Sequence, residues 1–347
     1  MDKLRALLFG SLLMLIIGWL MHVGKSVLVP VVLGAVIVYV IVGLADVLGR
    51  MPLVGARLPL RLRQVFSVGL IGLAFVVLAY LIMAHKERAL ALAPQYQESL
   101  LASIQRLAVQ LGVEQEPTWA TLRHELFGHV NLQRLFGSML ASLGSVLLGF
   151  VVVFLYATFL LVEYHGFDAK LANLSQDPQR VARIREVIQT INRRIGSYLA
   201  LKTVISALLG AVSWVIMVLF GLEFALLWAV LVAFLNFVPY VGSVLGVVLP
   251  VLMALVQFGE PGVVLTLLLA LTAAQCVIGN FLDPYLMGNS LNLSPLAILV
   301  SLALWSELWG IPGAFLAVPI TAIITIVLSE FAGTRPIAVL LSRSGRL

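Results

Sequence analysis

Two short polar interruptions in a long apolar stretch carry the residues best suited to chemistry in this sequence. Each begins with Asn-Phe, continues with Pro-Tyr and ends with Gly, at residues 236–242 and 280–288. Proline removes a backbone donor, and hydrocarbon offers no partner for the carbonyl group that is freed. Such interruptions persist only where protein or water surrounds them. Paired Pro- and Gly-interrupted segments of this kind point to a binding site within a membrane.

Amide, carboxylate and phenol groups at these interruptions could bind a polar solute or a cation. A third interruption, at residues 307–313, adds another carboxylate. The glycines in these interruptions are expected to let the backbone turn, or approach another backbone closely, rather than to contact a ligand. The candidate binding residues are Asn236, Pro239, Tyr240, Gly242, Asn280, Asp283, Pro284 and Glu307.

The two candidate carboxylates each allow a second interpretation. Asp283 could bind a cation or a hydroxyl group, or it could cap a helix that begins at Pro284, because Asp-Pro is common at helix N-termini. Glu307 stands between Trp305 and Trp309, so it is either a carboxylate of the site or an interfacial residue in an aromatic belt.

Other polar residues in apolar surroundings are weaker candidates. Gln275, Asn289 and Asn292 could line a cavity or could form hydrogen bonds between helices. Glu163 and Glu223 lie at expected helix ends, where interfacial water explains them.

Composition predicts an all-α polytopic membrane protein. Hydrophobic residues make up 61% of the 347 residues and charged residues 11%, against about a quarter charged in soluble domains. The net charge of +6 is expected to reflect cytoplasmic loops rather than nucleic-acid binding. The single cysteine, Cys276, excludes a disulfide within the chain.

The second half contains an apolar segment too long for one straight crossing. Residues 223–257 would form a helix roughly 50 Å long, beyond a hydrocarbon core of about 30 Å. The interruption at 236–242 either folds this segment into a re-entrant hairpin or splits it into two half-helices. With the other apolar runs we expect about eight transmembrane helices, including residues 6–23, 27–44, 65–84, a span within 132–163, and 199–220.

Charge sets the expected orientation and surface elements. Arginines in the loop at residues 46–64 and near the end of the chain place both termini in the cytoplasm. A basic amphipathic helix is expected from Pro178 at the cytoplasmic surface. Its basic residues either bind anionic lipid or simply follow the general excess of Lys and Arg on the cytoplasmic side. Residues 85–133 have balanced charge and helical periodicity, which indicates an extracytoplasmic cap that lies on the spans or binds a partner.

These elements divide the chain into five expected regions. They are a scaffold of three transmembrane helices (1–84), the helical cap (85–133), the fourth transmembrane helix with the basic helix (134–198), a transport core with broken helices (199–334) and a cytoplasmic tail (335–347).

Signatures of enzymes are absent from the sequence. There is no phosphate-binding Walker loop and no Gly-x-Ser-x-Gly elbow. His124 and His129 resemble a zinc-protease pair, but they are five residues apart rather than four, so they lie on different helix faces. We therefore expect no catalysis, no cofactor and no bound metal.

Several of these motifs together resemble the autoinducer-2 exporter family of bacterial inner-membrane transporters. They are residues 236–242, Asp283-Pro284 with Gly288, Ser294-Pro295, residues 309–314 and Val318-Pro319. The resemblance implies export of the quorum-sensing furanone autoinducer-2, or a related small polar solute, without ATP. It also implies a homo-oligomer such as a pentamer. Family members are associated with sodium- or lithium-linked proton antiport as well.

Three functions remain open from the sequence. One is a carrier for a small polar solute with Asn236, Tyr240, Asn280 and Asp283 around it. A second is a cation/proton antiporter in which Asp283 or Glu307 titrates. The third is a non-transporting membrane scaffold that presents the cap at residues 85–133 to a partner.

Overall fold

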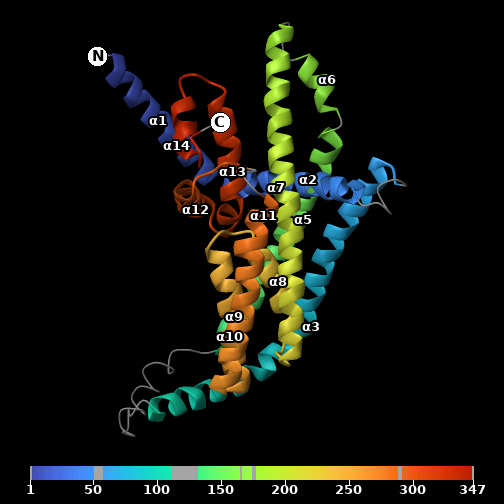
Figure 1. The fold of residues 1–347 in the computed structure, drawn as a ribbon, viewed down its shortest axis with the longest axis vertical. Helices are drawn as coiled ribbons and strands as arrows, with labels where there is room; N and C mark the ends of the chain where they lie inside the picture. The colour runs from blue at the N-terminus through green and yellow to red at the C-terminus, as the bar shows by residue number, and fades with distance from the viewer. Residues whose placement is uncertain are drawn as a thin grey trace. The chain divides into compact units, whose positions relative to one another are not determined.

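The computed structural model is built almost wholly from helices (Figure 1). It describes residues 2–50, 58–110, 132–164, 166–173, 177–287 and 291–345. Among these residues the only β-structure is an isolated bridge between Leu293 and Ser342. The chain forms two compact units, of residues 1–68, 149–201 and 287–347, and of residues 69–148 and 202–286.

The helices that belong wholly or partly to the first unit are α1 (Asp2–Val23), α2 (Lys25–Arg50), the start of α3 (Leu60–Gln110), the end of α5 (Leu132–Tyr164), α6 (Phe167–Ala172), the start of α7 (Pro178–Leu219), α12 (Pro295–Trp309), α13 (Ile311–Ser329) and α14 (Arg335–Leu341). The second unit holds the rest of α3, α5 and α7, together with α8 (Ala225–Leu235), α9 (Val241–Phe258), α10 (Pro261–Gln275) and the π-helix η1 (Cys276–Leu282). It ends within α11 (Asp283–Met287).

The helix lengths confirm an all-α polytopic membrane protein. Six helical segments among the described residues are long and apolar enough to cross a bilayer: Lys25–Gly49, Leu60–His85, Pro178–Leu219, Val241–Phe258, Pro261–Leu282 and Ile311–Ser329. Four shorter apolar helices accompany them: Leu8–Val23, Leu148–Tyr164, Ala225–Leu235 and Pro295–Trp309.

Small residues bring helices of the first unit close together. A Cβ atom on Gly43 would lie 2.6 Å from Cβ of Ala200 in α7, and one on Gly34 would lie 3.1 Å from the amide of Ala157 in α5. At the end of α12, Trp309 donates from Nε1 to the carbonyl of Met21, 3.0 Å away, which ties α12 to α1. Close backbone approach of this kind is how membrane helices gain packing energy.

The second unit packs around α7, α8 and α9. Its buried core includes Met217, Ala229, Met253 and Leu267, all 4% exposed or less. A Cβ on Gly210 of α7 would lie 2.9 Å from the carbonyl oxygen of Ala229, so α7 and α8 touch through their backbones there. This contact fixes α8 against the part of α7 that carries the candidate site.

The first predicted interruption is confirmed as a break between two helices. Helix α8 ends at Leu235 and α9 begins at Val241, and Tyr240 between them has φ of 60°. A Cβ on Gly242 would lie 1.7 Å from the carbonyl oxygen of Leu235, so only glycine allows the chain to turn back this tightly. With 11 residues α8 is about 16 Å long, too short to cross a core of about 30 Å, which favours a re-entrant hairpin.

The third predicted interruption forms a second hairpin, in the first unit. Helix α12 ends at Trp309, Gly310 has φ of 66°, and α13 begins at Ile311. A Cβ on Gly313 would lie 1.8 Å from the carbonyl oxygen of Trp305. Both hairpins therefore place a glycine against the carbonyl group near the end of the preceding helix.

The second interruption differs from its prediction. We expected unwound backbone after Asn280, but residues 276–282 form a π-helix that joins α10 to α11 without a gap. A π segment keeps the carbonyl groups hydrogen-bonded, which satisfies the backbone without unwinding. Gly288, at the end of the predicted interruption, lies outside the described residues.

Two helices are longer than expected. Helix α3 runs from Leu60 to Gln110 and joins the third span to part of the predicted cap, and α7 joins the basic helix to the fifth span. Residues 85–93, just after the expected border, are mostly strong helix formers and include no proline or glycine, so nothing ends α3 at that border. Residues 111–131, with the second cap helix, lie outside the described residues. The predicted tail contains a short helix, α14.

Candidate functional site

A buried ion pair occupies the centre of the candidate site, within the second unit. Nζ of Lys202 on α7 lies 2.7 Å from Oδ2 of Asp283 at the start of α11. The two side chains are 10% and 16% exposed. Burying charges is costly unless they are paired, and charged residues inside membranes usually serve a function. This pair therefore marks the candidate site of chemistry in the unit.

The π-helix before Asp283 positions this carboxylate. Each π turn accommodates an extra residue and so rotates the side chains that follow relative to a regular α-helix. Asp283 itself has φ of −57° and ψ of −55°, within continuous helix. The alternative that Asp283 caps a helix beginning at Pro284 is therefore wrong, because a cap residue stands outside the helical conformation.

One oxygen of Asp283 remains available. Oδ2 accepts from Lys202, whereas Oδ1 is buried and has no hydrogen-bond partner among the described residues. Leaving a buried acceptor unsatisfied costs about 1–3 kcal/mol. A ligand that donated a hydrogen bond to Oδ1, or a cation that bound it, would recover that cost.

Two amide–hydroxyl pairs belong to the same unit. Asn236, which follows α8, donates from Nδ2 to Oγ of Ser206 over 2.9 Å. Gln275, at the end of α10, donates from Nε2 to Oγ of Ser243 over 3.0 Å. Ser206 lies four residues after Lys202, so Asn236 and Asp283 contact the same face of α7 one turn apart. The first helix break and the π segment thus meet along α7.

The other predicted residues lie around this arrangement in different ways. Gly242 is buried at the hairpin turn, Pro239 is half-buried, and Tyr240 is half exposed with a strained positive φ. Asn280 is exposed on the π-helix, and Pro284 lies within α11. Tyr240 thus has a backbone role that the sequence did not indicate.

Three carboxylates are not part of the Lys202–Asp283 cluster. Glu307 lies on α12 in the first unit, and its side chain is exposed. Glu223 lies between α7 and α8, where it pairs with Arg88 over 3.2 Å. Glu163 pairs with Lys170. The positions of Glu163 and Glu223 at helix ends agree with the prediction made from their surroundings.

The remaining weak candidates, Gln275, Asn289 and Asn292, do not all belong to the site. Gln275 joins the site, as described above, whereas Asn292 belongs to the first unit and accepts from Oγ of Ser344 over 3.1 Å. Asn289 lies outside the described residues.

Sequence reasoning missed Lys202 and Ser206. Lys202 is not among the candidate residues named from the sequence, although it lies within an apolar run. The useful signal was the four-residue spacing of Lys202, Ser206 and Gly210, which gives α7 one face of polar and small residues. Small and polar residues on one face of a membrane helix indicate contact with other helices.

Comparison with known proteins places this arrangement in a family. The family described as "AI-2E family transporter" matches residues 9–333. The chain belongs to this family. It is therefore a transporter, and its helical hairpins and polar cluster are parts of a membrane transport protein.

Individual relatives agree with the family. The AI-2 transport protein TqsA of Escherichia coli K12 is 29% identical over 97% of this chain and 94% of its own length. A Borreliella burgdorferi protein is 37% identical over 56% of this chain, and YhhT of E. coli K12 is 31% identical over 59%. The matched part spans about half of each of these two proteins, 54% and 57%, but nearly all of TqsA.

Proposed function

We propose that this chain is a secondary transporter that exports a small polar solute without ATP, and that autoinducer-2 is this solute. The observation that carries the proposal is the buried Lys202–Asp283 pair, whose free oxygen Oδ1 lies in the unit that contains the α8–α9 hairpin. The full-length match to a protein named for AI-2 transport supports the choice of solute.

The chemistry of the site suits a neutral solute that carries hydroxyl groups. Lys202 offsets the charge of Asp283, so the pair adds no net charge. A hydroxyl group can donate to Oδ1 of Asp283, and the amides of Asn236 and Gln275 can both donate and accept. The affinity of such a site is expected to rise with each hydroxyl group of the solute that pairs with it, because unpaired buried polar groups are costly.

The α8–α9 hairpin is the element that we expect to expose this site to alternate sides. Asn236 belongs to the break itself, and its bond to Ser206 joins the break to α7. Movement of the hairpin against α7 would therefore open or close one wall of the site. Irregular backbone at membrane depth is tolerated where it lines such a cavity.

Cation/proton antiport is the second candidate, and the same ion pair favours it. A sodium or lithium ion that bound Asp283 would displace the ammonium group of Lys202. A proton and the cation would then compete for this carboxylate site, so that the binding of one releases the other. One cation would then enter for each proton that leaves, with no change in net charge.

The two candidates are separated by flux measurements on purified protein in liposomes that contain a pH-reporting dye. Autoinducer-2, sodium and lithium gradients are applied one at a time to the wild type and to Asp283→Asn. The export proposal expects saturable autoinducer-2 flux that falls at least about tenfold in the variant, without a cation-driven proton signal. A proton signal driven by sodium or lithium alone, and lost in Asp283→Asn, would replace the export proposal with antiport.

We further propose that the protein lies in the bacterial inner membrane as a homo-oligomer with both termini in the cytoplasm. The excess of Lys and Arg in the first loop and at the chain end supports this orientation. If folded protein moves no solute and no cation, the scaffold function of the cap at residues 85–133 becomes the better account.

A further inference from the structure

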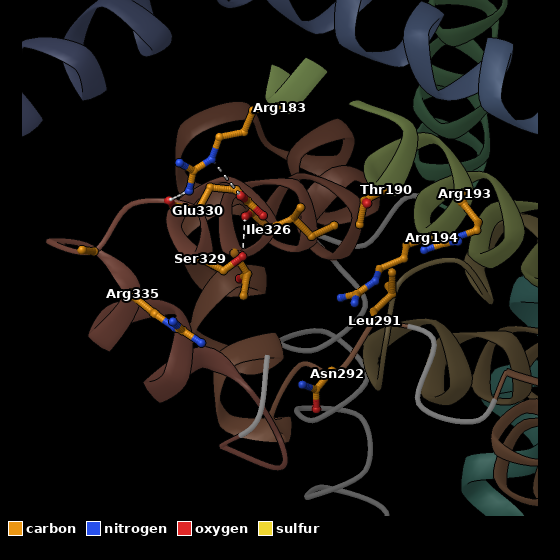
Figure 2. A pocket seen from close by; sticks show the side chains of 12 residues that line it. Arg183, Thr190, Arg193, Arg194, Leu291, Asn292, Ile326, Ser329, Glu330 and Arg335 are labelled. Carbon is orange, nitrogen blue, oxygen red and sulfur yellow. Dashed lines mark hydrogen bonds and ion pairs between the residues drawn. The ribbon is translucent and has the colours of Figure 1, made fainter. Parts of the chain in front are cut away.

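A basic cavity in the first unit has no part in the proposed transport site. Its volume is about 620 Å³, and α7, α13, α14 and the segment before α12 line it (Figure 2). This volume lies within the range of small-molecule binding sites and is far larger than a single ion needs. The charged residues that line it are Arg183, Arg193, Arg194, Glu330 and Arg335.

The charge of the cavity is strongly positive. Its only carboxylate among the lining residues, Glu330, is engaged by Arg183, whose Nε lies 3.9 Å from Oε2 and whose Nη2 donates to the Glu330 carbonyl over 3.2 Å. Arg193, Arg194 and Arg335 have no ion-pair partner among the described residues. Four arginines against one glutamate leave a net charge of +3.

The arginines of the cavity lie on one face of α7 and at the start of α14. Residues 183, 190 and 194 of α7 are spaced seven and four apart, so they share one helix face. The turn before α14 is held by Thr334, which donates to the carbonyl of Leu328 over 2.8 Å. Figure 2 shows Arg194 and Arg335 reaching into the cavity from different walls.

The segment before α12 forms the remaining wall. The amide of Arg343 donates to the carbonyl of Asn292 over 3.0 Å, and that of Ser294 donates to Leu341 over 2.9 Å. These bonds hold the chain beyond α14 against the segment before α12. Hydrogen bonds thus join three of the walls, α13, α14 and the segment before α12, and Arg183 joins α7 to Glu330.

We propose that this cavity binds a phosphate-bearing anion, either the headgroup of an anionic phospholipid or a soluble phosphorylated molecule. The planar fork of arginine pairs with phosphate oxygens in bidentate fashion, and charge-assisted bonds of this type are the strong ones. Hydroxyl and amide groups on the lining, including Thr190 and Asn292, match the polar remainder of such a ligand. The proposal does not depend on the transport function.

The test uses full-length protein in phosphatidylcholine nanodiscs. Inorganic pyrophosphate is titrated by calorimetry in one arm. In the other arm, phosphatidylglycerol is added to the nanodiscs and its retention on the released protein is measured by native mass spectrometry. The variant Arg194→Gln/Arg335→Gln removes two cations from the cavity. The control Arg61→Gln/Arg180→Gln removes two exposed arginines of the same unit that do not line the cavity, with the same change in net charge.

We expect at least one probe to bind the wild type and the control alike, and to bind the cavity variant about tenfold or more weakly. Binding of pyrophosphate identifies a soluble phosphate ligand, and retention of phosphatidylglycerol identifies a lipid. Arg194→Lys/Arg335→Lys keeps the charge without the forks and should give an intermediate affinity, which guards against a Gln variant that fails to fold. Failure of both probes to bind the wild type, or equal weakening in the control, would overturn the proposal.

Discussion

The Lys202–Asp283 pair is the residue-scale feature on which the functional account rests. Both side chains are more than four-fifths buried, and they come from positions 81 residues apart in the chain. A local sequence pattern cannot reveal such a pair, because nothing near Asp283 indicates which cation will face it. The pair is also unlike an interfacial salt bridge, since its charges gain little from water.

Removing one partner of this pair should destabilise the protein. We expect Lys202→Met to lower the free energy of unfolding by about 3 kcal/mol, because it leaves the Asp283 carboxylate buried without a counter-charge. Reversible unfolding in mixed micelles measures this value. The double variant Lys202→Met/Asp283→Leu should recover most of the loss, because no charge is then buried. A double variant as unstable as the single one would show that the two residues are not coupled.

A second residue-scale prediction concerns the amide at the first break. Asn236→Ala and Ser206→Ala should each lower stability, and a double-mutant cycle should give a coupling of about 0.6 kcal/mol, the mean for hydrogen bonds between membrane helices. Asn236→Ala should also weaken solute binding. Ser206→Ala should weaken solute binding less, because the side-chain amide of Asn236 is still present to contact the solute. Strictly additive effects would argue against the bond between them.

At the scale of elements, the two hairpins were predictable and the π-helix was not. Proline together with glycine at residues 236–242 and 307–313 favours a helix break, because proline lacks an amide donor and glycine tolerates a tight turn. Residues 276–282 contain no proline, and the neighbouring Asp283-Pro284 is compatible with a helix that continues. Local sequence does not specify whether the backbone there unwinds or widens to a π-helix.

The hairpin glycines give the element-scale prediction. Gly242→Ala and Gly313→Ala would each place a Cβ less than 2 Å from a backbone carbonyl oxygen, so we expect each variant to fold poorly or to lose its hairpin. Expression and size-exclusion profiles measure this.

Gly262→Ala is the matched control for these variants. No atom lies within 4 Å of the Cβ that it would add near the start of α10, and the substitution should stabilise by about 0.5–1 kcal/mol. Normal folding of Gly242→Ala or Gly313→Ala would contradict the observed turns.

At the scale of the whole molecule, composition alone predicts the class, because a chain with 11% charged residues cannot cover a soluble surface. The borders of its elements are less predictable. Helices α3 and α7 continue past the expected ends of their spans, because residues that favour helix in the membrane also favour it in water. The division into two compact units, with segments from several parts of the chain in each, follows from long-range contacts that no single stretch encodes.

The most direct test of the central claim is autoinducer-2 flux into liposomes that contain the wild type, Asp283→Asn or Glu260→Gln. Glu260 is an exposed carboxylate in the same unit, so its neutralisation controls for a change of one charge. We predict saturable flux for the wild type and Glu260→Gln, and a loss of at least about tenfold for folded Asp283→Asn. Equal flux in all three proteins would contradict the assignment of the site to the Lys202–Asp283 pair.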